Sequence, residues 1–355
     1  MKHAQLQIGW LCSFVPEEIT MAAGFLPMRL SGDIEGISIA DAYIYPNLCP
    51  YIKSILALGL NGKAKRLDGL VFARSCDGMR RMYDVWRSYI DTRFVYMLEV
   101  PKNRDDAAVK YFATQLRRFA SALQQEFGAE ITLASLNRAI KTANQIRMLM
   151  RRIYKLQRNI PLPLSGSEVF QLGLEGIQTD KKSFIAKLKR YHSDARSLVG
   201  PHRKGGKARV LISGNVMDRP DLFYLIEAAG ADVVAADLCT AMRYFEHPVD
   251  EDGDDPYLAL ARRYLSKLRC ARMTGLNERL AEVKELIKAY TVDGIIYTSV
   301  RFCDQHLYDV PYFMEKLKEE GMPALFLEND YSWSNTGQLK TRVEAFVEIL
   351  DSRRR

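Results

Sequence analysis

The residues best equipped for chemistry in this chain are its cysteines: Cys12, Cys49, Cys76, Cys239, Cys270 and Cys303. An even number of cysteines indicates disulfides mainly in secreted proteins. Residues 1–20 lack the basic start and continuous apolar run of a signal peptide, so we predict a cytoplasmic protein. Cysteines in that compartment are buried apolar residues, catalytic thiols or metal ligands.

Five of these cysteines are expected at the carboxyl ends of parallel strands or in the loops that leave them. The predicted strands that precede them are residues 8–14, 42–45, 68–74, 232–236 and 294–299. Open α/β sheets build their sites at that edge, whereas cysteines that fill a core favour strand interiors and helix faces. The exception is Cys270, which follows the predicted helix 257–268.

The residues beside three of the cysteines place each thiol at a helix start or turn. The segments are Leu48-Cys-Pro50, Ser75-Cys-Asp77 and Phe302-Cys-Asp304, in which we expect the two aspartates to be helix N-caps. Backbone N–H groups at such positions can hydrogen-bond sulfur and hold it as thiolate. Convergent thiolates from distant loops suit an iron–sulfur cluster, whereas structural zinc sites bring ligands as close pairs. Spacing alone leaves scattered structural cysteines as an equal alternative.

Short apolar runs alternate with amphipathic helices in both halves of the chain. This alternation predicts an α/β protein with parallel sheets covered on both faces. We divide the chain into a first α/β domain (residues 1–103), a helical region (104–200) and a second α/β domain (201–355). The polar, basic and glycine-rich residues 201–206 are the expected linker.

The net charge of +8 raises the question of nucleic-acid binding. No zinc-finger, helix-turn-helix or RNA-binding motif accompanies the basic residues, so we predict that nucleic acid is not a partner. A basic surface suits an acidic protein or an anionic cofactor equally well. No apolar stretch approaches the length of a membrane span, so we expect no membrane partner either.

Several motifs, in order along the chain, resemble one family. They are Leu11-Cys-Ser-Phe-Val-Pro-Glu-Glu18, Ala22-Ala-Gly-Phe-Leu-Pro-Met-Arg29, Leu48-Cys-Pro-Tyr51, Ser75-Cys-Asp77 with Tyr83-Asp-Val-Trp86, Asp237-Leu-Cys-Thr240 with Arg243-Tyr-Phe245, Phe302-Cys-Asp304 and Gly337-Gln-Leu-Lys-Thr-Arg342. These motifs resemble the 2-hydroxyacyl-CoA dehydratase D-component family, whose wider group includes benzoyl-CoA reductase subunits and double-cubane cluster proteins. The resemblance runs from about Gly9 to Glu348, nearly the whole chain.

The resemblance implies two Rossmann-like domains with a helical region between them, and an oxygen-sensitive iron–sulfur cluster held between the domains. It implies an ATP-hydrolysing iron–sulfur activator as partner, and a homodimer or a heterodimer with a related subunit. The chain lacks a G-x-x-x-x-G-K-[ST] loop, so it resembles the acceptor and not the activator. The implied activity is radical dehydration (a lyase) or reduction of an acyl-CoA. The alternative is a double-cubane reductase that acts on a small molecule without CoA.

The same resemblance makes Cys49, Cys76 and Cys303 the candidates to ligate a single [4Fe–4S] cubane. Three thiolates leave one iron open for water or substrate. With Cys12, Cys239 and Cys270 added, six thiolates would hold a double cubane. In a single-cubane protein Cys270 is the candidate for a structural role. The choice between one cubane and two stays open at this point.

Two side chains near these cysteines are candidates for proton transfer. Glu18 follows Cys12 closely, and His306 lies three residues beyond Cys303. His306 could donate to a sulfur or to bound substrate. The alternatives are that Glu18 complements a helix N-terminus and that His306 caps a helix or faces solvent.

Overall fold

The computed structural model describes residues 5–200, 206–332 and 336–354. Within them the chain forms two sheets of four strands each, and all strand pairs are parallel. The first sheet has the order β2-β1-β3-β4 and the second has the order β6-β5-β7-β8. The strands are β1 (Gln7–Trp10), β2 (Leu26–Arg29), β3 (Gly69–Ala73), β4 (Phe94–Leu98), β5 (Arg209–Gly214), β6 (Asp232–Asp237), β7 (Gly294–Val300) and β8 (Ala324–Asn329). The predicted α/β class with two Rossmann-like parallel sheets is confirmed.

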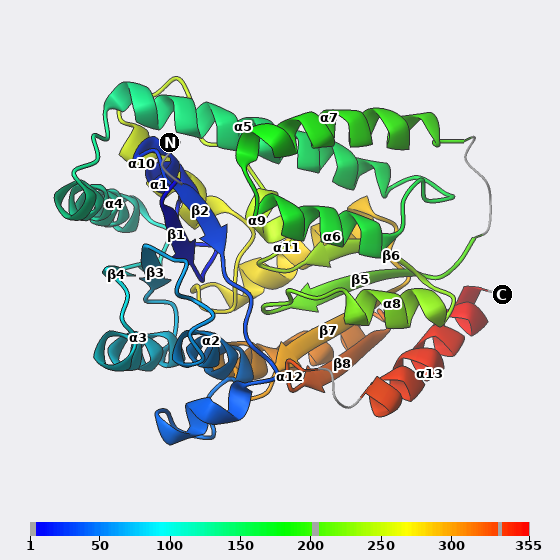
Figure 1. The fold of residues 1–355 in the computed structure, drawn as a ribbon. Coiled ribbons are helices and arrows are strands. Elements are labelled where there is room, and N and C mark those ends of the chain that lie inside the picture. Colours follow the sequence, from blue (N-terminus) through cyan, green and yellow to red (C-terminus); the bar gives the residue numbers. More distant parts are fainter. Residues whose placement is uncertain (1–4, 201–205, 333–335, 355) are drawn as a thin grey trace.

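The helices surround and connect these sheets. Figure 1 shows the first sheet on the left and the second on the right, with α5 and α7 along the top. The helices are α1 (Glu17–Ala22), α2 (Pro50–Leu60), α3 (Asp77–Tyr89), α4 (Asp106–Phe127), α5 (Leu133–Leu156), α6 (Gly166–Gly176), α7 (Lys181–Ser197), α8 (Asp221–Ala228), α9 (Met242–Phe245), α10 (Pro256–Ser266), α11 (Leu276–Ala289), α12 (Asp304–Glu319) and α13 (Thr336–Arg354), with one 3₁₀ helix, η1 (Ile37–Ala42). No helix in the described part of the chain is long and apolar enough to cross a membrane.

Both sheets have the same strand order, and each reverses its direction of winding at one place. In the first sheet the chain moves from β1 outward to β2, then to the other side of β1 for β3 and β4. The second sheet repeats this with β5, β6, β7 and β8. Loops therefore diverge at the carboxyl ends of β1 and β3, and again at those of β5 and β7. Such switch points are where open parallel sheets bind ligands.

The two halves share a hydrophobic core. One cluster of buried side chains contains Trp10 of β1, Phe112 of α4, Ile146 of α5 and Ile295 of β7. Trp10 also stacks on Tyr244 of α9, with ring centroids 5.4 Å apart. The division at residues 103 and 200 stays a prediction, and residues 201–205 of the expected linker lie outside the described residues.

One predicted strand is wrong. Residues 42–45 are not a strand: Ala42 ends the helix η1 and Tyr43 is its C-cap. Two side chains of this segment, Tyr43 and Tyr45, lie exposed at the surface. An apolar run this short has no periodicity that separates a strand from a helical turn. The strand expected over residues 8–14 is also shorter, because β1 ends at Trp10.

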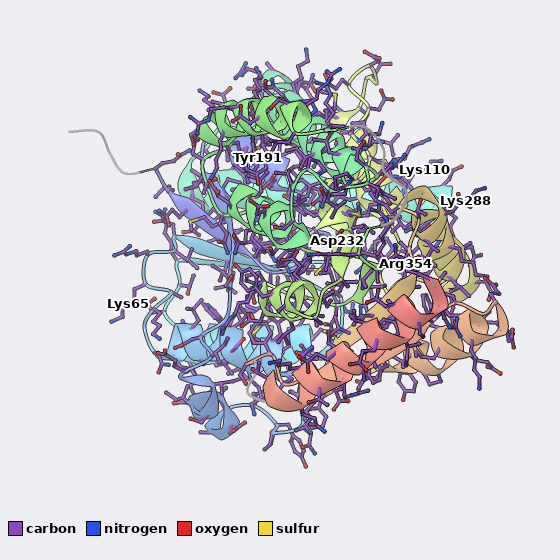
Figure 2. All side chains as sticks on the ribbon, turned by 90° about the vertical axis from the view of Figure 1, so that its right-hand side faces the viewer. Lys65, Lys110, Tyr191, Asp232, Lys288 and Arg354 are labelled. Carbon is purple, nitrogen blue, oxygen red and sulfur yellow. The ribbon has the colours of Figure 1, made fainter. Side chains whose placement is uncertain are left out.

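Exposed lysines lie on opposite sides of the molecule. Lys65 is on the left of the side view in Figure 2, and Lys110 and Lys288 are on the right. Other basic side chains are neutralised locally, as in the pairs Arg74–Glu99 and Arg93–Glu126. The most consequential basic residues are the buried ones described below.

Candidate functional site

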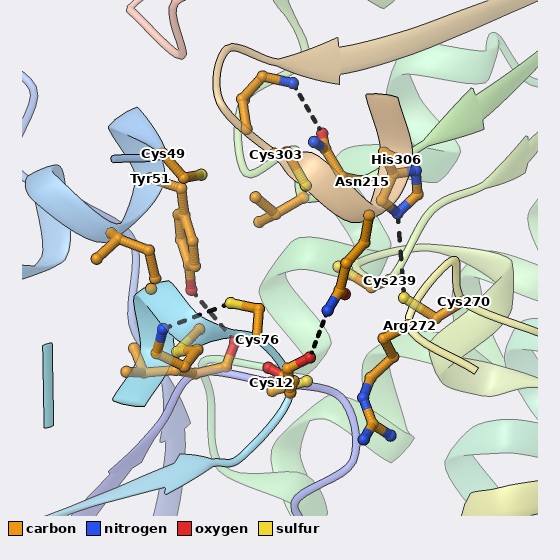
Figure 3. A pocket seen from close by; sticks show the side chains of 18 of the residues that line it. Cys12, Cys49, Tyr51, Cys76, Asn215, Cys239, Cys270, Arg272, Cys303 and His306 are labelled. Atoms are coloured by element: carbon orange, nitrogen blue, oxygen red, sulfur yellow. Dashed lines mark hydrogen bonds between the residues drawn. The ribbon is translucent and has the colours of Figure 1, made fainter. Parts of the chain in front are cut away.

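All six cysteines line one cavity. Its volume is about 380 Å³, and its walls come from the loops after β1, β3, β5, β6 and β7 (Figure 3). The thiols are free and half-buried. The carboxyl edges of both sheets therefore face the same space, which brings together side chains that are up to 291 positions apart in the chain, from Cys12 to Cys303.

Strand ends account for four of the six thiols, not five. Cys12, Cys76, Cys239 and Cys303 follow β1, β3, β6 and β7, as predicted. Cys49 follows η1 and a short loop and directly precedes α2. Cys270 lies between α10 and α11. Both nevertheless reach the cavity, because the segments that carry them pack beside the sheet edges.

Three thiols stand directly at helix starts, and we name Cys49, Cys76 and Cys303 the helix-start thiols. They are the N-cap residues of α2, α3 and α12. The Sγ of Cys76 accepts a hydrogen bond from the backbone N–H of Met79 at 3.4 Å. Helix N-termini carry partial positive charge and unpaired N–H groups, which stabilise a thiolate or a bound anion. The expected N-caps Asp77 and Asp304 are wrong by one position, because the preceding cysteine takes that place.

The other three thiols lie among buried cations, and we name Cys12, Cys239 and Cys270 the basic-side thiols. The Nη2 of Arg29, at the end of β2, donates to the Sγ of Cys239 at 3.6 Å. Lys267 is fully buried and donates to the Oγ of Ser13 at 2.8 Å. The buried side chains of Arg243 and Arg272 also line the cavity.

These cations interact electrostatically with the basic-side thiols. Arg29 and Arg243 lower the pKa of Cys239, although burial raises it more, so the net shift is upward. Burial lowers the pKa of Lys267 well below its ordinary value, and Cys12, Cys270 and Cys239 act in the opposite direction. The cavity thus has one wall of helix N-termini and one wall of side-chain cations. Both arrangements favour negative charge between them.

Arg29 has capacity for a further partner. Its side chain is 3% exposed, yet the buried Nε and Nη1 atoms have no hydrogen-bond partner among the described residues. Burial alone would lower the pKa of this guanidinium, but Cys239 and Tyr51 outweigh burial and raise it. A buried charged group with unused donors is costly unless something accepts from it. A cavity that receives an anionic group would satisfy this requirement.

In the protein by itself the pKa of each helix-start thiol is shifted upward. Burial and the neighbouring thiols raise the pKa of Cys49 and Cys303, and they raise that of Cys76 to about 12. No group of three His, Cys, Asp or Glu side chains in the described residues is placed to hold a metal ion. Ligands of a cluster bind different metal atoms and so stand apart. The donor set fits a multi-iron, thiolate-bound group.

Glu18 does not lie at the cavity. Its carboxylate is fully buried in α1, where it pairs with Arg147 of α5 and accepts from Tyr264 of α10 at 2.8 Å. Burial raises the pKa of Glu18, but Arg147 and Arg263 more than compensate, and the net pKa is lowered. Glu18 therefore ties three helices together in the structure, and its predicted part in proton transfer has no geometric support.

His306 does line the cavity. Its ring is buried, with Nε2 4.0 Å from the Sγ of Cys270 and Nδ1 3.0 Å from the hydroxyl of Tyr297. Burial and the cations Arg279 and Arg243 hold the pKa of His306 well below its ordinary value. A role for His306 in proton transfer stays a prediction. Its position beside a thiol is the feature on which that prediction depends.

Sequence reasoning missed the buried cations of the site. Arg29 ends an ordinary strand, and Lys267 and Arg272 flank Cys270 in a stretch of basic residues that looks like solvated surface. The available signal was position: Arg29 is the last residue of a strand, at the edge where Cys12 was already expected.

Comparison with known proteins assigns nearly the full length of the chain to one family. The model of the family described as 2-hydroxyglutaryl-CoA dehydratase, D-component, matches residues 12–350. The chain belongs to this family. It is 31% identical to the protein YjiM of Escherichia coli (strain K12), over 97% of this chain and 91% of that protein.

Other members of the family carry functional names. A benzoyl-CoA reductase subunit of Thauera aromatica is 27% identical, over 97% of this chain and 90% of the relative. The (R)-phenyllactyl-CoA dehydratase beta subunit of Clostridium sporogenes is 25% identical, over 99% and 94%. The relatives of this chain thus include subunits named for reduction and subunits named for dehydration.

Proposed function

We propose that this chain is the iron–sulfur subunit of an enzyme of the 2-hydroxyacyl-CoA dehydratase or benzoyl-CoA reductase type. In this proposal it receives low-potential electrons from an ATP-hydrolysing activator and acts on an acyl-CoA. The observation that carries the proposal is the convergence of six free thiols from both sheets on one cavity of about 380 Å³. When bound, an iron–sulfur cluster supplies single electrons at low potential and, where a ligand position is open, a Lewis acid.

The residues of the chain would contribute to this chemistry in three ways. The helix-start thiols Cys49, Cys76 and Cys303 would hold a [4Fe–4S] cluster at the N-termini of α2, α3 and α12. The buried charged side chains of the cavity wall lie in surroundings of lower dielectric constant than water, which strengthens their electrostatic interactions. The buried cations opposite would stabilise the negative charge that arrives with each electron.

A second candidate is a double-cubane reductase that acts on a small molecule without CoA. The observation that favours it is that all six thiols, and not only the helix-start thiols, line the cavity. Within each group the thiols interact electrostatically, as Cys49 does with Cys303 and Cys76, and as Cys239 does with Cys270 and Cys12. Interactions of Cys76 with Cys12 and of Cys303 with Cys270 also link the two groups. Each group draws ligands from both halves of the chain. Six ligands in two trios suit two cubanes as well as three ligands suit one.

Iron analysis separates these candidates and tests the proposal itself. Protein purified under strict exclusion of oxygen should contain about four irons per chain for one cubane or about eight for two. Iron-free, colourless protein from such a preparation would overturn both. The matched variants are Cys303→Ser from the helix-start thiols and Cys239→Ser from the basic-side thiols. Under the first proposal only Cys303→Ser loses iron, whereas under the second each variant loses about half or more.

Activity measurements with acyl-CoA thioesters then distinguish the two candidate functions. With an activator of this family, ATP and a panel of 2-hydroxyacyl-CoA thioesters, the first proposal expects conversion to the enoyl-CoA. The second expects no conversion of any thioester, with eight irons present. Since the family members named above are subunits, the assay should include a related partner subunit as well as the chain alone.

A further inference from the structure

The imidazole of His306 is held between the cavity and the interior of the second sheet. His306 is in the first turn of α12, and its side chain is buried. Figure 3 shows the ring beside Cys270, with Nε2 toward the cavity, and the Nε2–Sγ distance is 4.0 Å. The other ring nitrogen, Nδ1, lies 3.0 Å from the hydroxyl oxygen of Tyr297 in β7. Which nitrogen carries hydrogen decides whether the ring gives or takes a hydrogen bond at the cavity.

Tyr297 has two hydrogen-bond partners in the described structure, and they constrain it. The first is Arg279 of α11, whose Nη2 lies 3.0 Å from the tyrosine oxygen. A guanidinium has only donors, so the tyrosine oxygen must accept from Arg279. The second partner is Nδ1 of His306, which is the remaining acceptor for the single hydroxyl hydrogen. Burial raises the pKa of Tyr297 to about 12, so the hydroxyl keeps that hydrogen near neutral pH.

Arg279 is itself fixed in place. Its Nη1 donates to the carboxylate of Asp309, one turn beyond His306 in α12. The guanidinium also lies over the ring of Phe313, 4.6 Å from its centroid. The side chain is fully buried, so it has no solvent in which to reorient. Asp309, Arg279 and Tyr297 therefore form a hydrogen-bonded chain that ends at Nδ1 of His306.

We infer that Tyr297, positioned by Arg279, fixes His306 as the tautomer whose Nε2 carries the hydrogen, so that the ring presents an N–H donor to the thiol-lined cavity. The opposite tautomer would place a hydrogen on Nδ1 facing Tyr297, whose own hydrogen would then have no acceptor among the described residues. Tyr297 and Arg279 are positioning residues, because neither lines the cavity.

This assignment defines what His306 can recognise. An N–H donor beside Cys270 suits a thiolate sulfur, a sulfide or a carbonyl or anionic oxygen of a bound molecule. It does not suit a ligand that offers only donors. In this tautomer Nε2 already carries a hydrogen and cannot accept a proton. His306 would therefore be a hydrogen-bond donor at the cavity and not a base.

The test is nitrogen NMR of the full-length chain, labelled with ¹⁵N-histidine and prepared without iron under anaerobic conditions. The chain has five histidines, and His306→Gln identifies the signal that belongs to His306. Long-range ¹H–¹⁵N spectra distinguish protonated from unprotonated ring nitrogens. We expect a protonated-type shift at Nε2 and an unprotonated-type shift at Nδ1 in the wild type. Tyr297→Phe removes the hydrogen given to Nδ1 and should shift Nδ1 toward the protonated type.

The matched control is Tyr244→Phe. Tyr244 is buried like Tyr297, and its hydroxyl has no hydrogen-bond partner in the described structure. Its loss should leave both His306 shifts unchanged. A wild-type His306 with hydrogen on Nδ1, or a Tyr297→Phe variant with unaltered shifts, would overturn the inference.

A second variant keeps the test decisive if Tyr297→Phe fails to fold, as judged by its melting temperature. Arg279→Met then takes its place and should shift Nδ1 toward the protonated type, because the donor that directs the hydroxyl hydrogen of Tyr297 toward Nδ1 is lost. Unaltered His306 shifts in that variant would contradict the positioning role of Arg279. The outcome does not depend on whether the thiols hold iron, so it can fail separately from the proposed function.

Discussion

Replacement of Arg29 by methionine should make the thiol-bound group harder to reduce. In the structure the Nη2 of Arg29 lies 3.6 Å from the Sγ of Cys239, and two further N–H-bearing nitrogens are buried without partners among the described residues. Under the proposed function, each electron that enters the cavity would add one negative charge, which this guanidinium would stabilise. Methionine has a similar length and no charge, so the variant removes the attraction while largely keeping the packing.

The size of the effect follows from Coulomb's law. At about twice the Arg29–Cys239 distance and an effective dielectric constant of about 20, a unit charge pair interacts by about 2 kcal/mol. For a one-electron couple this corresponds to a fall in reduction potential of about 90 mV. The fall of about 90 mV is an upper bound. Three nearby cations remain in the variant and can move closer to the added charge: Arg243, Lys267 and Arg272.

The assay is a reductive titration of the iron-loaded protein, followed by electron paramagnetic resonance. Arg29→Lys keeps the charge and should shift the potential much less than Arg29→Met. A matched control is Arg209→Met, which removes an equally buried arginine at the start of β5, on the opposite edge of the second sheet from the cavity. Equal potentials for wild type and Arg29→Met, at full iron content, would refute the electrostatic role assigned to Arg29.

Two further predictions concern the scaffold of the site. Glu18→Gln breaks a buried ion pair with Arg147 and should lower the free energy of unfolding by about 3–5 kcal/mol in urea titrations. Since the pKa of Glu18 is lowered in the fold, its contribution is present above the unfolded pKa and disappears as pH falls, so the variant should lose part of the wild type's acid sensitivity. Gly214→Ala would place a Cβ 2.1 Å from the backbone oxygen of Thr298 and should lower the free energy of unfolding by about 1–3 kcal/mol. The control is Gly337→Ala, whose Cβ would meet nothing within 4 Å and should leave the free energy of unfolding nearly unchanged. Equal melting temperatures for the two variants would contradict this prediction.

Much of the fold was predictable because the buried strands have distinctive composition. β3 reads Gly-Leu-Val-Phe-Ala and is buried at every position, as expected of a central strand covered on both faces. β7 behaves in the same way. Such runs, separated by amphipathic helices, leave few alternatives to a parallel sheet. The short segment at residues 42–45 carried no such pattern, and the strand predicted there was wrong.

Local sequence also determined which thiols would meet helix N-termini. Proline or aspartate directly after Cys49, Cys76 and Cys303 favours a helix start, and all three cysteines are N-cap residues. Their identity as a group therefore follows from residues adjacent in the chain. The alternative given for Glu18 was also local: an acidic residue in a first helical turn, where the structure has it in α1. The buried arginine that it meets could not be predicted in this way.

The cysteines by themselves indicated a thiol-rich site, and the tertiary structure decided its composition. Only the fold, in which the carboxyl ends of both sheets face one space, placed all six thiols on one cavity beside Arg29, Arg243 and Arg272, with Lys267 buried near the basic-side thiols. Likewise, only the fold brought Asp309, Arg279, Tyr297 and His306 together in one series of hydrogen bonds. These features depend on contacts between residues far apart in sequence, whose burial and partners no local pattern specifies, because charge and hydrogen-bond state are set by the surroundings and not by the residue type.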